Sequence, residues 1–249
     1  MSGKMVLSTS LLIAYENMAS NPRTYQKKYK KLMKKLVLPY LTNKRQIVEA
    51  KAEGLIDTVY DRLLPQLQNL PNRDDDLTTL AVTTSLKVIL TEDKNASLPY
   101  VYYKSQFLNN ELTVSLKPTE NRSDLIKYLE FLTSNATKII ICDNYFASNW
   151  DNTCSLFLSI LPRHKLEIEF VETPDSIQVT KNSAKMTQGY VEAIYSDWTI
   201  KESASYQGSH DRYLLIDSPE GKVEVMLSSG FFHIWSQNPK EITCVFRQI

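Results

Sequence analysis

The sequence is poor in glycine, with only six in 249 residues. It contains no glycine-rich phosphate-binding loop and no Walker A lysine loop, which argues against the P-loop class of nucleotide-binding proteins. Cysteine is also scarce, and the three residues form no C-x-x-C pair and no Cys/His cluster: Cys142, Cys154 and Cys244. We therefore predict no zinc site, no other metal and no cofactor, and free thiols in a reducing compartment.

Long apolar runs are absent too. No stretch of about 18 apolar residues occurs, so the sequence predicts no transmembrane helix. The N-terminal residues 1–4 lack the apolar core of a signal peptide, which makes the cytoplasm the expected location.

Charge is unevenly distributed although the net charge is only +1. The stretch from Arg23 to Arg45 holds nine Lys and Arg residues and no acid, which leaves 20 basic against 28 acidic residues elsewhere. Helical spacing over residues 22–38 predicts an amphipathic helix with a tyrosine-rich apolar stripe. Six lysines flank that stripe: Lys27, Lys28, Lys30, Lys31, Lys34 and Lys35.

These lysines predict contacts with the phosphate backbone of a nucleic acid, which is DNA or RNA. Two alternatives remain open, namely an anionic membrane surface and an ordinary solvated helix face. The membrane is the weakest of the three, because the stripe is rich in tyrosine rather than in bulky aliphatic residues, so we expect no membrane partner.

The order of patterns predicts an α+β protein with two regions. A helical, basic N-terminal region spans residues 1–76, with helices expected at 5–20, 22–38 and 44–68, and it ends in a polar linker at 70–76. Residues 77–249 are expected to form a mixed β-sheet flanked by helices. Its first strand or strand pair is predicted at 77–90, and a buried parallel strand at 138–142.

The most informative stretch runs from His210 to Asp217. In an extended strand His210, Arg212, Leu214 and Ile216 share one face, so an imidazole and a guanidinium point the same way at the mouth of a mostly apolar strand. Such a pair is suited to bind phosphate. The alternative is an edge strand with solvated polar ends.

This stretch resembles the HxKx4D motif of the phospholipase D superfamily, with Arg212 in place of lysine. The His-Asp-Arg form is similar to the phospholipase-D-like C-terminal domain of MIT-domain proteins and its bacterial relatives. Upstream, the strand 138–142 followed by Asp143 resembles the strand that ends in Asp-Pro-Tyr in those domains, with Asn144 where proline is usual. The resemblance covers about residues 120–249.

The resemblance implies chemistry through a phospho-histidine intermediate without a metal. Two copies of the motif meet in that superfamily, whereas this chain has one, so catalysis implies a homodimer. His210 would then be nucleophile and acid, Arg212 would bind the phosphoryl oxygens, and Asp217 would orient His210. The segment expected to bind phosphate downstream falls at Ser228 and Ser229, but the family's asparagine is missing there.

Three functions follow from these patterns. The first is a phosphate-binding module for nucleic acid with a degenerate phospholipase-D-like motif, and the bacterial relatives suggest a defence or mobile-element complex. The second is a metal-independent homodimeric phosphodiesterase or nuclease. The third is a scaffold subunit that docks on a larger protein complex through its N-terminal helices. His233 is expected either to pack among aromatic residues or to lie near the motif.

Overall fold

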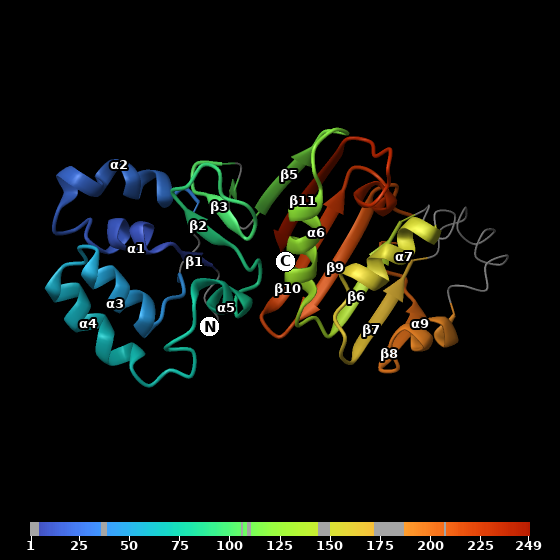
Figure 1. Cartoon of the computed structure of the whole chain (residues 1–249), viewed down its shortest axis with the longest axis horizontal. Coiled ribbons are helices and arrows are strands. Elements are labelled where there is room, and N and C mark those ends of the chain that lie inside the picture. The colour runs from blue at the N-terminus through green and yellow to red at the C-terminus, as the bar shows by residue number, and fades with distance from the viewer. Residues whose placement is uncertain are drawn as a thin grey trace. The chain divides into compact units, whose positions relative to one another are not determined.

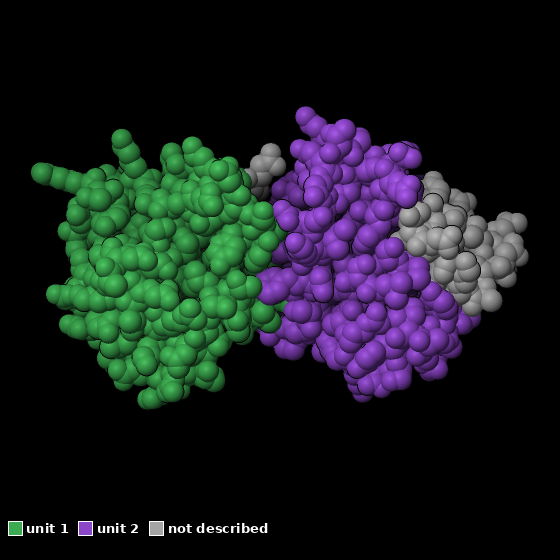
Figure 2. Space-filling model, in the orientation of Figure 1, with its two compact units in different colours: residues 1–111 green, residues 112–249 purple. Residues whose placement is uncertain are grey.

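The computed structural model describes residues 5–35, 39–105, 107–108, 111–143, 150–171, 187–206 and 208–249. Helices and sheets are both present, so the protein is of mixed α and β structure. The chain forms two compact units, residues 1–111 and 112–249 (Figure 2). The division therefore follows Glu111 rather than residue 76, because strands on both sides of residue 76 pair within the first unit.

Unit 1 combines helices with a small parallel sheet in the order β1-β2-β3. The first strand pairs with the second across more than 80 residues of sequence, as Val6 lies opposite Ile89. The elements are β1 (Val6–Leu7), α1 (Thr9–Glu16), α2 (Pro22–Leu32), α3 (Lys44–Ala52), α4 (Asp57–Leu67), α5 (Leu77–Val82), β2 (Ile89–Thr91) and β3 (Tyr100–Tyr102).

The helix expected over residues 44–68 is two helices, α3 and α4. Gly54 separates them with φ of +113°, a conformation that glycine adopts without a steric penalty. Asn17 braces the turn, since its Nδ2 donates to the Gly54 carbonyl at 2.8 Å and its Oδ1 accepts from the Ile56 N–H at 3.2 Å. The amide side chain thus pairs backbone groups that the break leaves without helical partners.

The strand expected over residues 77–90 begins instead as the helix α5. Asp76 caps this helix, because its Oδ1 accepts the Thr79 N–H at 2.7 Å. Only Ile89 and Leu90 of the expected strand belong to β2. The N-terminal helix expected at 5–20 is likewise shorter, because Val6 and Leu7 form β1.

The larger sheet is mixed and has eight strands in the order β4-β5-β11-β10-β9-β6-β7-β8 (Figure 1), and its strands from β6 to β11 lie in unit 2. Strands β6, β7 and β8 run parallel, whereas β9 is antiparallel to both β6 and β10. Its strands are β4 (Phe107–Leu108), β5 (Glu111–Leu116), β6 (Lys138–Cys142), β7 (Leu166–Phe170), β8 (Trp198–Glu202), β9 (Arg212–Ser218), β10 (Gly221–Leu227) and β11 (Ile242–Gln248).

In the part of unit 2 that the structure describes, the helices are α6 (Ser123–Thr133), α7 (Trp150–Ser159) and α9 (Gln188–Ile194), with the 3-10 helix η1 (Phe231–Ile234) before β11. Helices α6 and α7 lie over one face of the sheet (Figure 1). Tyr128 of α6 meets Phe246 of β11 edge to face at 5.1 Å between ring centroids, and Phe157 of α7 lies 6.4 Å from Trp198 of β8. This helix-covered face carries the apolar core of the unit.

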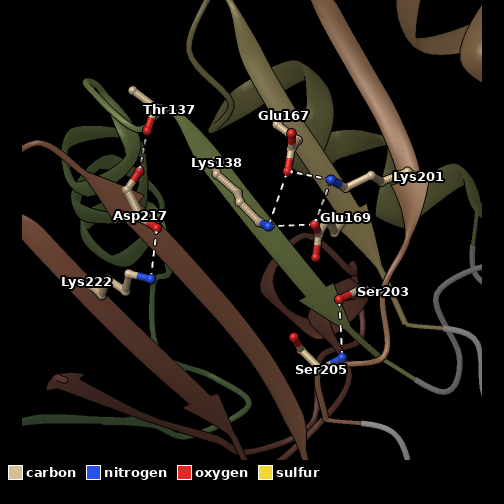
Figure 3. A network of polar contacts seen from close by, with 9 residues as sticks. All are labelled: Thr137, Lys138, Glu167, Glu169, Lys201, Ser203, Ser205, Asp217 and Lys222. Atoms are coloured by element: carbon tan, nitrogen blue, oxygen red, sulfur yellow. Dashed lines mark hydrogen bonds and ion pairs between the residues drawn. The ribbon is translucent and has the colours of Figure 1, made fainter.

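The second face of the sheet, defined by Lys138, Glu169, Lys201 and Tyr213, is more polar. A lattice of ion pairs crosses β6, β7 and β8 on it (Figure 3). Tyr206, from the connection between β8 and β9, stacks on Tyr213 at 4.5 Å. The two faces therefore alternate along each strand, as the period of two predicts.

No helix in the described residues has both the length and the apolar character needed to cross a bilayer.

Candidate phosphate-binding sites

Three segments of unit 2 end or begin at the same end of the sheet. Strand β6 ends at Cys142, next to Asp143. Strand β9 is antiparallel to β6 and begins at Arg212 there. Arg212 lies opposite Leu227, the last residue of β10. The topology thus brings Asp143, Arg212 and the segment after β10 together, although about 90 residues of sequence separate the first from the last.

Asp143 lies at the centre of this sheet end and is 3% exposed. Its Oδ2 accepts the backbone N–H of Phe231 at 2.8 Å, and its Oδ1 lies 4.0 Å from Nε of Arg212. One carboxylate therefore contacts both the start of β9 and the start of η1. The sequence placed Asp143 at a strand end but did not identify Arg212 as its partner.

Gly230 lies against the same carboxylate. A Cβ atom at this position would come within 3.3 Å of Asp143 Oδ2 and within 3.0 Å of the Phe232 ring. A side chain at position 230 would therefore crowd the Phe232 ring and the Asp143 carboxylate.

Arg212 is half-buried, with 22% of its side-chain surface exposed. The buried Asp143 carboxylate lies 4.0 Å from Nε of this guanidinium. An arginine guanidinium is planar and can bind two phosphate oxygens at once.

His210 lies two residues before Arg212 but outside the strand. Strand β9 begins at Arg212, so the alternation that aligns Arg212 with Leu214 and Ile216 does not extend to His210. Leu214 and Ile216 are buried, as predicted, and His210 is exposed. The imidazole is therefore at the same sheet end as Arg212, on the connection that precedes the strand.

Asp217 lies far from His210. It stands near the other end of β9, opposite Lys138 at the start of β6. A strand rises about 3.3 Å per residue, which places Arg212 and Asp217 roughly 16 Å apart. Asp217 instead forms an ion pair with Lys222 at 3.1 Å (Figure 3). Within one chain it is not placed to orient His210, so that predicted role is not met by the geometry.

Ser228 and Ser229 follow β10 at the Arg212 end. Ser228 extends the pairing with β11, because its N–H donates to the Thr243 carbonyl at 3.0 Å and its Oγ accepts the Thr243 N–H at 2.9 Å. In the second of these bonds the Ser228 hydroxyl is an acceptor, so its O–H can still act as a donor. Both serines stay predicted phosphate ligands, and Ser228 is the more exposed of the two.

His233 is buried in η1 and packs on the Phe232 ring at 3.8 Å between centroids. Its Nδ1 accepts the Lys240 N–H at 3.2 Å, which places the ring proton of the neutral form on Nε2. Burial, together with the positive charges of Lys240 and Arg122, lowers the pKa of His233. The neutral ring is thus favoured near Arg212.

Arg122 holds this segment in place. It is 7% exposed, and its guanidinium donates to the carbonyls of His233 at 3.1 Å, Lys240 at 2.9 Å and Glu120 at 2.6 Å. Sequence alone gave no sign of this role, because the arginine follows a polar loop. It is a structural residue that fixes η1 beside Asp143.

The second predicted site is α2 of unit 1, and the structure divides its six lysines into two groups. Lys28 forms an ion pair with Glu92 at 2.8 Å, and Lys35 donates to the Ser105 carbonyl at 2.9 Å. These two lysines serve the fold of unit 1. The other four are exposed: Lys27, Lys30, Lys31 and Lys34.

The exposed lysines share one side of α2 with Arg23. Steps of four, seven, eight and eleven residues from Arg23 fall within an arc of about 100° at 3.6 residues per turn, with Lys34 in the turn after the helix. The opposite side packs inward, where Leu32 is fully buried and Tyr29 lies 5.5 Å from Tyr15. We call these five side chains the cationic stripe: Arg23, Lys27, Lys30, Lys31 and Lys34.

The described residues contain no group of three or more His, Cys, Asp or Glu side chains arranged to hold a metal ion.

Comparison with known proteins gives little. No family model and no curated protein matches the chain. One similar solved structure is the polyphosphate kinase from Porphyromonas gingivalis, at 10% identity and a TM-score of 0.32. The match covers 55% of this chain and 23% of that one, so the chain spans about a quarter of its length. A likeness this low carries no argument, and the resemblance to the phospholipase D superfamily stays a prediction.

Proposed function

We propose that this protein binds the phosphate backbone of nucleic acid through the cationic stripe of α2. The observation that carries the proposal is the division of the lysines. The fold uses Lys28 and Lys35, and the other four stand exposed on one side of a helix that contains no acidic residue. Lysines in this arrangement neutralise several phosphates at once and release their counterions.

The packing of α2 favours nucleic acid over a membrane surface. Interfacial helices bury an apolar side in the lipid headgroups, opposite to their cationic side. The apolar side of α2 is already committed to unit 1, since Leu32 is fully buried and Tyr29 packs on Tyr15. What remains exposed is charge, which suits a phosphate backbone.

The test is fluorescence anisotropy with labelled single- and double-stranded DNA and RNA of 20 nucleotides in 50 mM salt. We expect Lys27→Ala/Lys30→Ala/Lys31→Ala/Lys34→Ala to weaken binding at least about 100-fold, because four phosphate contacts are lost. The matched control is Lys28→Ala/Lys35→Ala, which should stay within about threefold of the unchanged protein. Equal losses in both variants, or none in the first, would contradict the proposal.

A second candidate function rests on the pairing of Arg212 with Asp143. A guanidinium 4.0 Å from a buried carboxylate, at the same end of the sheet as the exposed His210 and Ser228, supports a phosphoester site. In the catalytic version, two chains bring their His210 residues together and hydrolyse a phosphodiester without metal. If the site only binds, it holds a phosphate group without cleaving the phosphodiester, as expected of a subunit in a bacterial defence or mobile-element complex.

Incubation with end-labelled DNA and RNA in EDTA, beside His210→Ala, separates the three functions. Cleavage that disappears in His210→Ala supports the phosphodiesterase. A mobility shift without cleavage supports the binding module. The absence of both results supports the scaffold subunit, which docks through its N-terminal helices.

A further inference from the structure

The two lysines that fix α2 within unit 1 show what lies beside the cationic stripe. Lys28 Nζ lies 2.8 Å from the carboxylate of Glu92, directly after β2, and Lys35 donates to the Ser105 carbonyl at 2.9 Å, shortly after β3. At 3.6 residues per turn, Lys28 is about 60° around the helix axis from Lys31 of the stripe. The cationic stripe therefore borders the flank of α2 that contacts the ends of β2 and β3.

Tyr102 is the last residue of β3 and lies at these strand ends. Its carbonyl accepts the Ser105 N–H at 2.8 Å, and the carbonyl of the same Ser105 accepts the Lys35 ammonium group. Across the sheet, Tyr102 pairs with Thr91, whose next residue is the Glu92 that holds Lys28. Two short paths of contacts thus connect the backbone of Tyr102 with α2.

The side chain of Tyr102 is partly exposed, whereas Val101 and Tyr103 on either side of it are buried. This alternation is expected where one face of a strand packs on the core. The Tyr102 ring meets the buried Tyr103 ring edge to face, at 5.5 Å between centroids and an interplanar angle of 83°. Tyr102 therefore presents aromatic surface to solvent while a buried ring supports it.

Lys104 adds a positive charge at this position. Its side chain is exposed, and its Nζ lies 5.7 Å from the centre of the Tyr102 ring and 5.1 Å from that of Tyr103. The nearby carboxylate of Glu92 is already paired with Lys28. An exposed aromatic ring beside several lysines is the combination with which proteins bind single strands, since the lysines contact phosphates and the ring stacks on a base.

We infer that the nucleic acid bound by the cationic stripe is single-stranded, and that one of its bases stacks on Tyr102. This inference rests on the proposed function and adds the class of strand to it. The stripe and Lys104 would contact the phosphates, and the Tyr102 ring would take an unpaired base. A duplex would meet the charges alone, because its bases are already paired and stacked on one another.

The experiment is fluorescence anisotropy of the full chain with labelled 20-nucleotide single strands of DNA and RNA, their duplexes, and a strand of the same length without bases. We expect Tyr102→Leu to weaken binding of the normal single strands about tenfold, because a stacking contact is lost. Binding of the duplexes and of the base-free strand should stay within about twofold. The matched control Tyr102→Phe keeps the ring and should stay within about twofold on every strand.

The base-free strand keeps the inference testable if Tyr102→Leu does not fold, because the unchanged protein should bind it about tenfold more weakly than the normal strand. Equal binding of these two strands would overturn the inference. So would a loss in Tyr102→Leu that is the same for single strands and duplexes. In both cases the proposed function would stand as long as binding depends on the cationic stripe. Binding of no strand at all would overturn the inference and the proposed function together.

Discussion

Lysines in two regions of this molecule have opposite surroundings. On α2 the cationic stripe has no acidic residue within the helix, and its lysines extend into solvent. On the second face of the unit 2 sheet, Lys138 and Lys201 each lie between the same two carboxylates, Glu167 and Glu169 (Figure 3). The first group is available to an external anion, whereas the second is neutralised within the fold.

The difference follows from the period of each element. Residues four apart on a helix share a side, so a run of lysines with spacings of three and four gathers positive charge. In neighbouring parallel strands, residues in register share a face, so Lys138 meets Glu167 on β7 and Glu169 lies one pleat further on the same face. Local sequence therefore decides the first arrangement, and strand order decides the second.

The largest expected effect that separates the two regions is the response to salt. If four lysines of the cationic stripe contact phosphates, affinity for a DNA duplex should fall about 100-fold between 50 and 200 mM salt. The ion pairs on the sheet are partly shielded, so the free energy of unfolding should change by less than about 0.5 kcal/mol over that range. Anisotropy titrations and urea unfolding measure the two quantities. A binding affinity that does not depend on salt would contradict the comparison.

A second test removes one carboxylate at a time from the ion pairs on the sheet. Glu169 has 8% of its side chain exposed and contacts both lysines, so Glu169→Ala should lower the free energy of unfolding by about 1–3 kcal/mol. Glu167 contacts the same lysines with 40% exposed, and Glu167→Ala should cost less than about 1 kcal/mol. Urea unfolding at pH 7 decides the order. Equal losses would mean that burial does not strengthen these pairs.

The pH dependence of the free energy of unfolding tests the contribution of the same ion pairs. Burial opposes ionisation of Glu169, but hydrogen bonds from Lys138, Ser203 and Lys201 outweigh it and lower its pKa to about 2 from 4.5. A carboxyl with a lowered pKa stabilises the fold above pH 4.5 and loses that contribution as the pH falls towards 2. The advantage over Glu169→Gln should therefore be full at pH 6 and shrink below pH 4.5. A constant difference across this range would exclude ionised Glu169 as its source.

The sequence was sufficient to predict a helix or strand where the local pattern of that one element determines its structure. The start of the helix expected at residue 44 is confirmed, because Asn43 directly before it caps α3 and its Oδ1 accepts the Gln46 N–H at 2.9 Å. The run 138–142 was predicted as a buried parallel strand, and β6 has these bounds. The α2 helix was also predicted, but it ends at Leu32, and residues 36–38 of the expected range lie outside the described residues.

The sequence was insufficient to predict structure that depends on contacts between segments far apart in the chain. Residues 77–82 include two threonines and a valine, which favour strands, yet the Asp76 cap starts a helix there. The contact between Asp143 and Arg212 requires β9 to run antiparallel beside β6, which no local pattern shows. The same holds for the division of the α2 lysines, because Glu92 and Ser105 come from later in the chain.

The smallest expected effect distinguishes the two lysines of the lattice. Lys138 lies on the interior strand β6 with 32% of its side chain exposed, and Lys201 lies on the edge strand β8 with 55% exposed. Removal of Lys201 should therefore cost about 0.2–1 kcal/mol, and removal of Lys138 somewhat more. Urea unfolding of Lys201→Ala and Lys138→Ala, each combined with Glu169→Ala in a double-mutant cycle, isolates the two pair energies. A larger coupling for Lys201 would mean that strand position, rather than exposure, sets the strength of an ion pair on this sheet.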